Sequence, residues 1–147
     1  MEGFISNHLI ELALCARLVV AFVCGGLIGW QRKKAKGDDN SVYRTHVLIC
    51  LGAALVAATS ELISYSHVGV DVTRISAQVI SGISFVGVGV IVKHGNAING
   101  LTTAGTLWSV GAIGIAVGSG AFILGVVATL LILILLLTAR DKKNEGF

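Results

Sequence analysis

Charged residues are scarce in this sequence, and proline is absent altogether. Only 13% of the 147 residues are charged, and the mean hydropathy is +0.86. This composition is too apolar for an ordinary soluble domain and indicates a polytopic membrane protein with the lipid bilayer as its surroundings. The net charge of +3 comes from basic residues beside apolar runs, where they act as topology signals. No nucleic-acid partner is therefore expected.

Motifs for enzymatic and metal chemistry are also missing. The sequence has no P-loop, no nucleophile elbow and no HExxH, so we expect that the protein is not an enzyme. Cys15, Cys24 and Cys50 lack CxxC spacing and are interpreted as small residues of membrane helices. Glycine, by contrast, occurs 19 times. Pairs four residues apart, at 25 and 29 and at 114 and 118, predict close helix crossings within one bundle or between subunits.

Five apolar runs are each long enough to cross about 30 Å of hydrocarbon. They cover residues 10–30, 45–63, 74–92, 101–117 and 120–138. A polar loop at 93–99 separates the third run from the fourth. The predicted fold class is all-α, a polytopic membrane helical bundle of about five transmembrane helices. Because only Gly118, Ser119 and Gly120 separate the last two runs, one long or re-entrant segment is the alternative there.

Basic residues test this count because they accumulate in cytoplasmic loops. With five spans, one side of the membrane receives Arg32, Lys33, Lys34, Lys36, Arg44, Lys93, Arg140, Lys142 and Lys143. The N-terminus is then expected outside and the C-terminus in the cytoplasm. We expect residues 1–139 to form one transmembrane domain. Residues 140–147 are expected to be a short basic cytoplasmic tail, with no soluble C-terminal domain.

The third and fourth apolar runs each carry a polar stripe. At 3.6 residues per turn, Asp71, Arg74, Gln78 and Ser81 share one face of the third helix. The hydroxyls of Thr102 and Thr106 share one face of the fourth helix. The predicted polar seam between these helices consists of Asp71, Arg74, Gln78, Ser81, Thr102, Thr106 and Trp108. The seam can be a cation or partner site headed by Asp71. The interpretation we favour is structural: Asp71 and Arg74 form an ion pair, and Gln78 forms a hydrogen bond to a neighbouring helix.

Arg17 lies about two turns inside the first run, where a charge needs a partner. It can extend outward, or it can pair with Glu11, Glu61 or Asp71 at the outer edge. Those three carboxylates are the only acidic groups in or near the predicted membrane region, so they are candidates for a shallow cation site. A structural ion pair and a functional site are equally good interpretations of Arg17.

Arg44, Thr45 and His46 open the second predicted helix. Thr45 can cap it, and Arg44 can reach lipid phosphates. His46 can titrate near neutral pH or bind a metal, but His8, His67 and His94 form no ligand spacing with it. We therefore do not favour metal ligation by His46.

The segment from Arg74 to Trp108 resembles the signature of the MgtC/SapB family of bacterial inner-membrane proteins. The family pattern reads D-P-x-R-I-A-A-Q-V-V-S-G-I-G-F-L-G-A-G, then a loop, then G-L-T-T-A-A-T-L-W. Its matching residues here are Asp71, Arg74, Ile75, Ala77, Gln78, Val79, Ser81, Gly82, Ile83, Phe85, Gly87, Gly89, Gly100, Leu101, Thr102, Thr103, Ala104, Thr106, Leu107 and Trp108. The ordered match is long, which makes it far more specific than one short motif.

An earlier block resembles the same family's R-L…G-x-x-I-G-x-[EQ]-R…L-R-T-H pattern. It matches at Arg17, Leu18, Gly25, Ile28, Gly29, Gln31, Arg32, Arg44, Thr45 and His46. Two departures stand out. Val72 replaces the proline after Asp71, which predicts a different entry turn into the third helix, and Val88 is larger than the family's alanine.

The resemblance implies a protein of the bacterial cytoplasmic (inner) membrane that is linked to magnesium homeostasis. Some family members are named as magnesium transporters, whereas others look like regulators that contact membrane partners such as the proton-translocating ATP synthase. A regulatory role is favoured here, because a Mg²⁺ carrier needs several carboxylates and none lies near mid-membrane. The alternative is transport of Mg²⁺ or another small solute along the polar seam. No cofactor is expected, apart from Mg²⁺ itself as a candidate, and the glycine-rich bundle suggests a homodimer.

Overall fold

The computed structural model describes residues 2–66, 71–94 and 97–144. They form five helices: α1 (Glu2–Ala35), α2 (Asn40–Ser66), α3 (Val72–Gly89), α4 (Leu101–Gly118) and α5 (Phe122–Asn144). The predicted all-α helical bundle is therefore confirmed. Two short strands, β1 (Val92–His94) and β2 (Ala97–Asn99), pair antiparallel where a polar loop was expected.

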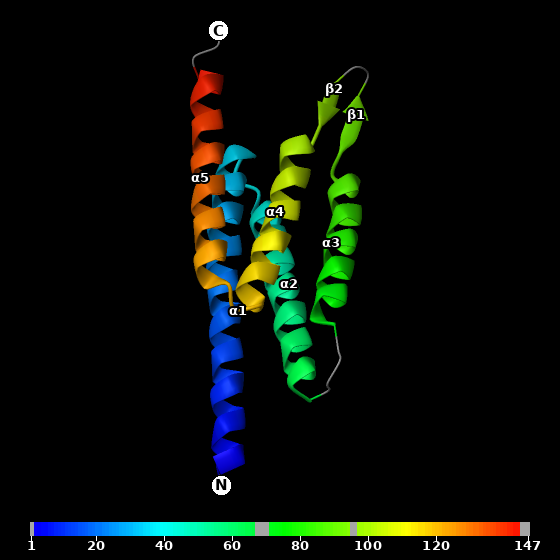
Figure 1. The fold of residues 1–147 in the computed structure, drawn as a ribbon. Coiled ribbons are helices and arrows are strands. Elements are labelled where there is room, and N and C mark those ends of the chain that lie inside the picture. The colour runs from blue at the N-terminus through cyan, green and yellow to red at the C-terminus, as the bar shows by residue number, and fades with distance from the viewer. Residues whose placement is uncertain (1, 67–70, 95–96, 145–147) are drawn as a thin grey trace.

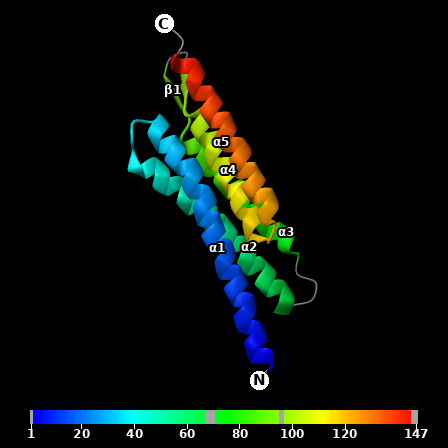
Figure 2. The same cartoon turned by 90° about the vertical axis from the view of Figure 1, so that its left-hand side faces the viewer.

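Consecutive helices run in opposite directions, as Figures 1 and 2 show. The α1–α2 turn, the β1–β2 hairpin and the end of α5 lie at one end of the molecule (Figure 1). The end of α2 and the starts of α1 and α3 lie at the opposite end. Helix α5 continues to Asn144 and so includes residues that were expected to form a tail.

Four helices are long and apolar enough to cross a membrane among the residues described. Their spans are Ile10–Ala35, Asn40–Tyr65, Val72–Gly89 and Leu101–Gly118. The apolar part of α5, Phe122–Thr138, is shorter than these. It nevertheless runs antiparallel to α4 (Figure 1), so α4 and α5 are two helices and not one continuous segment.

Local chemistry explains where several helices begin and end. Asp71 is the N-cap of α3, and its carboxylate accepts a hydrogen bond from the backbone N–H of Thr73 at 2.9 Å. Asp71 therefore supplies a start signal for α3, although Val72 stands where the family pattern has proline. Gly100 precedes α4 with φ 89°, and Gly120 separates α4 from α5 with φ 86°. Both conformations lie in the left-handed region, which glycine enters without steric cost.

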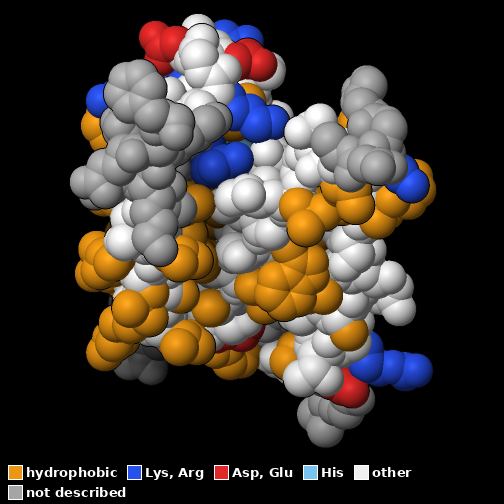
Figure 3. All heavy atoms as spheres, turned by 90° about the horizontal axis from the view of Figure 1, so that it is seen from above, with side chains coloured by type: hydrophobic (Ala, Val, Ile, Leu, Met, Phe, Trp, Pro, Cys, Tyr) orange, Lys and Arg blue, Asp and Glu red, His pale blue; other side chains and the backbone are white. Residues whose placement is uncertain are grey.

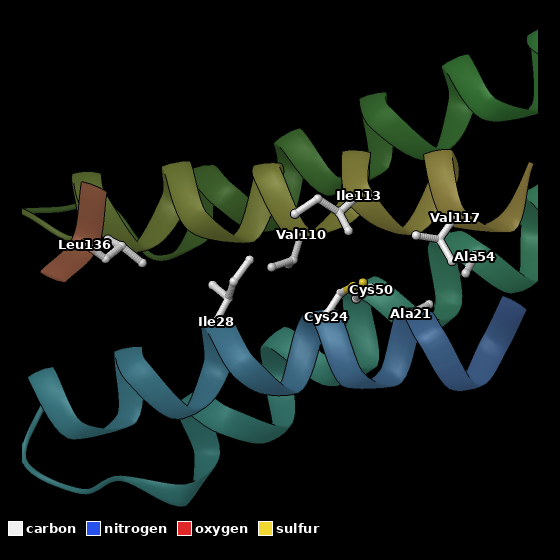
Figure 4. Close-up of a cluster of buried hydrophobic side chains, with 9 residues drawn as sticks. All are labelled: Ala21, Cys24, Ile28, Cys50, Ala54, Val110, Ile113, Val117 and Leu136. Carbon is white, nitrogen blue, oxygen red and sulfur yellow. The ribbon is translucent and has the colours of Figure 1, made fainter. Parts of the chain in front are cut away.

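Helices α1, α2 and α4 pack pairwise and surround the core. Figure 4 shows its side chains, which are mostly small, converging from these three helices, with Leu136 added from α5. The buried cluster consists of Ala21, Cys24, Ile28, Cys50, Ala54, Val110, Ile113, Val117 and Leu136. Small apolar side chains bring helix backbones close together, which is how helices associate without a hydrophobic driving force from water.

Glycine makes these close crossings sterically feasible. A Cβ atom on Gly29 of α1 would lie 2.9 Å from the Tyr43 carbonyl oxygen, and one on Gly25 would lie 2.7 Å from the Cys50 Cβ. On α4, a Cβ on Gly114 or Gly118 would collide with the backbone carbonyl of Cys50 or Ala54, respectively. Both predicted glycine pairs therefore serve helix contacts inside one bundle, so the alternative of subunit contacts is not needed for them.

Candidate functional site

One polar cluster joins α1, α2 and α4 toward the end of the molecule at which α2 ends and α3 begins. We call it the Arg17 cluster (Arg17, Glu61, Tyr65 and the Gly118 carbonyl). Arg17 Nη1 donates to Glu61 Oε2, and Arg17 Nη2 donates to Glu61 Oε1 at 3.3 Å. The two side chains are only 16% and 25% exposed. Tyr65 Oη also donates to Glu61 Oε1 at 3.0 Å. The guanidinium thus neutralises this carboxylate at two points.

Arg17 also closes the end of α4. Its Nη1 donates to the carbonyl oxygen of Gly118, the last residue of that helix, at 2.9 Å. Helix C-termini have unpaired carbonyls and a partial negative charge, which a cation stabilises. One side chain of α1 therefore binds both α2 and the end of α4. Of the three partners considered for Arg17 from the sequence, the structure selects Glu61.

The other two outer carboxylates lie elsewhere. Glu11 is exposed on α1 and lies 3.7 Å from His8 Nδ1. Asp71 is exposed and engaged as the N-cap of α3, where its carboxylate accepts hydrogen bonds from Thr73. Those hydrogen bonds hold the pKa of Asp71 below its ordinary range. The structure therefore does not bring Glu11, Glu61 and Asp71 together as one cation site.

A second polar cluster joins the same three helices toward the other end, and we call it the His46 cluster (Arg32, His46, Thr103 and Thr106). His46 is completely buried. Its Nδ1 lies 2.7 Å from the Val42 carbonyl oxygen, and its Nε2 lies 3.0 Å from Thr106 Oγ1. Since a carbonyl oxygen can only accept, Nδ1 carries a proton.

Arg32 completes this cluster from α1. Its Nη2 donates to Thr103 Oγ1 on α4 at 3.2 Å, while Thr106 Oγ1 lies 2.9 Å from the Thr103 carbonyl oxygen. Both ring nitrogens of His46 are thus engaged by protein groups. Among the residues that the structure describes, no group of three or more His, Cys, Asp or Glu could hold a metal ion.

The two clusters have the same spacing on all three helices. Arg17 and Arg32 are fifteen residues apart on α1, as are His46 and Glu61 on α2 and Thr103 and Gly118 on α4. At 1.5 Å per residue this separation is about 22 Å along each helix. The apolar core occupies the space between them. Polar contacts therefore tie the bundle at two levels, and the distance between the levels is smaller than a hydrocarbon thickness of about 30 Å.

The seam predicted between α3 and α4 is not formed within the chain. Asp71, Arg74, Gln78 and Ser81 are all exposed, because α3 packs on the bundle through the opposite side, with Ile83 and Gly87 buried. The prediction identified the polar stripe of α3 correctly but assigned it to the wrong side of the helix. Amphipathic spacing alone does not say which side meets the bundle.

The predicted residues on α4 are separated as well. Thr102 is exposed, whereas Thr106 is buried against His46 of α2. Trp108 is 45% exposed and borders an open groove of about 290 Å³ between α4 and α5, with Leu124 and Ile132 on the far side. Trp108 therefore faces α5, and the groove is apolar.

At the start of α2, the role expected for Thr45 is wrong, whereas Arg44 lies as expected. The helix begins at Asn40, so Thr45 is not its cap, and the Thr45 hydroxyl donates to the Ser41 carbonyl oxygen at 2.8 Å. Such a bond back to the preceding turn is common for threonine within helices. Arg44 is exposed on the same turn, as its expected place at the membrane surface requires.

Sequence reasoning missed Gln31, Arg32 and Thr103 as site residues. Gln31 is 5% exposed, and its Nε2 donates to the Leu136 carbonyl oxygen of α5 at 3.2 Å. Its Oε1 and the Nε of Arg32 are buried without a protein partner among the described residues. All three residues match the family pattern, and the recurring spacing of fifteen residues is the signal that could have identified Arg32 and Thr103.

The part of the chain that the structure describes has five helices, four of them long and apolar enough to cross a membrane, which defines a multi-pass membrane protein. The MgtC family pattern matches residues 18–144, and the chain belongs to that family. It is 40% identical over 126 residues to the "Putative magnesium transporter YhiD" of Escherichia coli (strain K12), covering 82% of this chain and 57% of that protein. No solved structure matches the chain.

Proteins named MgtC are similarly related. The "Protein MgtC" of Brucella abortus (strain 2308) is 40% identical over 118 residues, which cover 80% of this chain and 48% of that protein. The "Protein MgtC" of Salmonella typhimurium is 38% identical over 131 residues, which cover 87% of this chain and 54% of that protein. The chain therefore spans about half the length of the curated relatives it matches.

Proposed function

We propose that this protein is a magnesium-linked regulator of the bacterial inner membrane that acts by contacting membrane-protein partners. Its relatives carry the names MgtC and putative magnesium transporter, which supports a link to magnesium. The regulatory part of the proposal rests on the interior of the bundle. Among the side chains described, no carboxylate lies in the apolar core between the Arg17 cluster and the His46 cluster.

Ion chemistry explains why this interior favours regulation over transport. Mg²⁺ is held by a near-octahedral set of oxygens, and it loses its water molecules reluctantly. The core offers alanine, cysteine, valine, isoleucine and leucine side chains, which supply no such ligands. At the Arg17 cluster the guanidinium already occupies both oxygens of Glu61. A divalent cation there would have to displace a fixed positive charge.

The charge distribution supports the orientation proposed from the sequence. The end that carries the α1–α2 turn and the hairpin holds Arg32, Lys33, Lys34, Lys36, Arg44 and Lys93. Figure 3 views this end and shows several Lys and Arg side chains on it, with Asp and Glu side chains beside some of them. We call it the basic end. Under the positive-inside rule this end lies in the cytoplasm and the N-terminus lies outside.

Regulation of a membrane partner by contact makes and breaks no covalent bond, so we propose a non-enzymatic role. The partner class we favour is the proton-translocating ATP synthase, which the family resemblance raised. The printed name of the Escherichia coli relative favours the alternative, a Mg²⁺ or small-solute transporter. Since the predicted seam does not form inside one chain, a transporter would need another route.

Two assays on the same purified chain separate these functions. The first measures Mg²⁺ entry into proteoliposomes with a trapped magnesium dye, for the parent chain and for Asp71→Asn. The second adds the chain to vesicles containing ATP synthase and follows ATP-driven proton uptake. An unrelated multi-pass protein at equal mass is the control in both assays.

We expect no Mg²⁺ flux above the control and a dose-dependent change in proton uptake. Saturable Mg²⁺ flux above the control would overturn the regulatory proposal and establish a transporter, and loss of that flux in Asp71→Asn would place the route beside α3. Unchanged proton uptake with well-folded chain would exclude ATP synthase as the partner. Circular dichroism of each preparation confirms that helices are intact before either result is interpreted.

A further inference from the structure

The outward side of α3 combines polar and bulky apolar groups and meets no other part of the described chain. Arg74, Gln78 and Ser81 are exposed on it, and Phe85 follows with 84% of its surface exposed. Ile83 and Gly87 on the other side of the helix contact the bundle. This outward side, from Asp71 to Gly89, is called the α3 outer face below.

Lipid is a poor environment for this face. Helix α3 is one of the candidate membrane spans, and Gln78 lies almost two turns inside it, about 9 Å from its first residue. Among the described residues the Gln78 carboxamide has no hydrogen-bond partner. Burying an unpaired amide in an apolar medium costs several kcal/mol, and the hydrocarbon supplies no partner. A protein surface that does supply one should therefore cover this face.

We propose that the α3 outer face binds the same face of a second copy of this chain, in a two-fold dimer. Two copies inserted in the same orientation are related by an axis along the membrane normal, so each residue meets its counterpart at the same depth. A glutamine carboxamide is both donor and acceptor, so Gln78 can bond to the Gln78 of the second copy. Such interhelical bonds are a known means of helix association in membranes.

The charges on this face are also self-complementary. Asp71 and Arg74 lie one turn apart on the exposed side at its membrane edge. Across a two-fold axis, each carboxylate can approach the guanidinium of the other copy, which produces two opposite-charge pairs and no excess charge. Gly82 and Gly89 face open space, so the two helix backbones can come close. A second copy of the chain carries the groups that this face needs, namely a carboxamide for Gln78 and opposite charges for Asp71 and Arg74. A partner with a different sequence would need its own groups at the same positions.

Disulfide cross-linking in vesicles tests the placement of the interface. Cys15, the exposed native cysteine, is first replaced in Cys15→Ser. Single cysteines are then introduced by Ser81→Cys or Val88→Cys on the α3 outer face. The control is Ile123→Cys on α5, where the native side chain is 82% exposed. We expect disulfide-linked dimers from Ser81→Cys and Val88→Cys at high dilution in lipid, and none from the control.

Single-molecule photobleaching of labelled chains in bilayers measures the affinity independently. Gln78→Leu should weaken dimerisation roughly three- to thirtyfold, the range expected for one interhelical polar contact in a membrane. Gln78→Asn, which keeps a carboxamide, should weaken it less. Chains that stay monomeric at every density, or cross-linking equal at Ile123→Cys and Ser81→Cys, would overturn the proposal. So would a cross-link from Ser81→Cys exclusively to a different protein in native membranes. Because these readouts score self-association alone, a negative result leaves the regulatory proposal standing.

Discussion

His46 on α2 and Thr106 on α4 are joined by a buried contact of 3.0 Å between the imidazole Nε2 and the hydroxyl oxygen. The Val42 carbonyl fixes the ring proton on Nδ1, so a neutral imidazole presents Nε2 as an acceptor to the Thr106 hydroxyl. The same hydroxyl lies 2.9 Å from the Thr103 carbonyl oxygen. Its single proton therefore has two competing acceptors, one on each of two helices.

The first prediction concerns this contact. Thr106→Val keeps the shape of the side chain but leaves His46 Nε2 buried without a donor. The free energy of unfolding should fall by about 1–3 kcal/mol, the usual cost of an unsatisfied buried polar group. Thr106→Ser restores the hydroxyl and should recover much of that loss. Chemical unfolding in detergent micelles provides the measurement, and equal stability of the Val and Ser variants would contradict the assigned hydrogen bond.

The second prediction concerns the pair between Arg17 and Glu61. Arg17→Met leaves a carboxylate that is mostly shielded from water, and Glu61→Gln leaves a guanidinium that is shielded slightly more. Each single change should destabilise the fold, because the remaining charge loses its partner. A double-mutant cycle should give a coupling energy of roughly 0.5–3 kcal/mol. Strict additivity of the two unfolding free energies would show that the pair contributes nothing as a unit.

The third prediction compares two glycines of the same helix. Gly114→Ala places a methyl group against the Cys50 carbonyl of α2, whereas Gly105→Ala places one in open space. Overpacking should cost Gly114→Ala about 1–3 kcal/mol of unfolding free energy. Gly105→Ala should be neutral or slightly stabilising, because alanine is the better helix former. Thermal unfolding of the two purified variants checks this, and comparable melting temperatures would argue against a close α2–α4 crossing.

The fourth prediction is a pH dependence caused by Asp71. Hydrogen bonds from the Thr73 hydroxyl and backbone N–H lower the pKa of this carboxylate. A lowered pKa in the folded state means that the carboxylate stabilises the fold above its ordinary pKa. That contribution is lost as the pH falls through the folded-state pKa. Asp71→Asn keeps a capping side chain that does not ionise.

The corresponding measurement is the unfolding midpoint of the parent chain and of Asp71→Asn from about pH 7 down to about pH 3, a range that brackets ordinary carboxyl pKa values. The parent should lose stability on acidification relative to the variant. Thr73→Val removes one of the two donors and should reduce the difference between the two chains. Parallel pH curves for parent and variant would mean that Asp71 is not held by these bonds.

Much of the fold could be predicted because it depends on local pattern. The five apolar runs became five helices, since length and hydropathy alone decide which segments enter a bilayer. The helix ends extend beyond the predicted runs, because polar residues such as those from Gln31 to Lys34 continue α1 past its apolar part. Hydropathy predicts where the apolar run ends, but it does not predict how far the helix continues into water.

The candidate site was less predictable, because its members come from three helices. The sequence indicated that Arg17 needs a partner, but three carboxylates were equally good candidates until α1 and α2 were placed side by side. His46 was judged an unpromising metal ligand, and both of its ring nitrogens are engaged by Val42 and Thr106. The α3 stripe was found, yet its direction was wrong. Ile83 and Gly87 fit the bundle and turn the stripe outward.

By itself, the sequence determined that this is a multi-pass helical membrane protein of the MgtC family, because composition, run length and an ordered motif are properties of the chain alone. Tertiary structure alone decided which polar groups meet. Small residues at 25, 29, 114 and 118 let α1, α2 and α4 approach closely. That approach brings Arg17 to Glu61 and His46 to Thr106 at two levels of the bundle. Pairing of this kind depends on how helices rotate about their axes, and periodicity leaves that rotation undetermined.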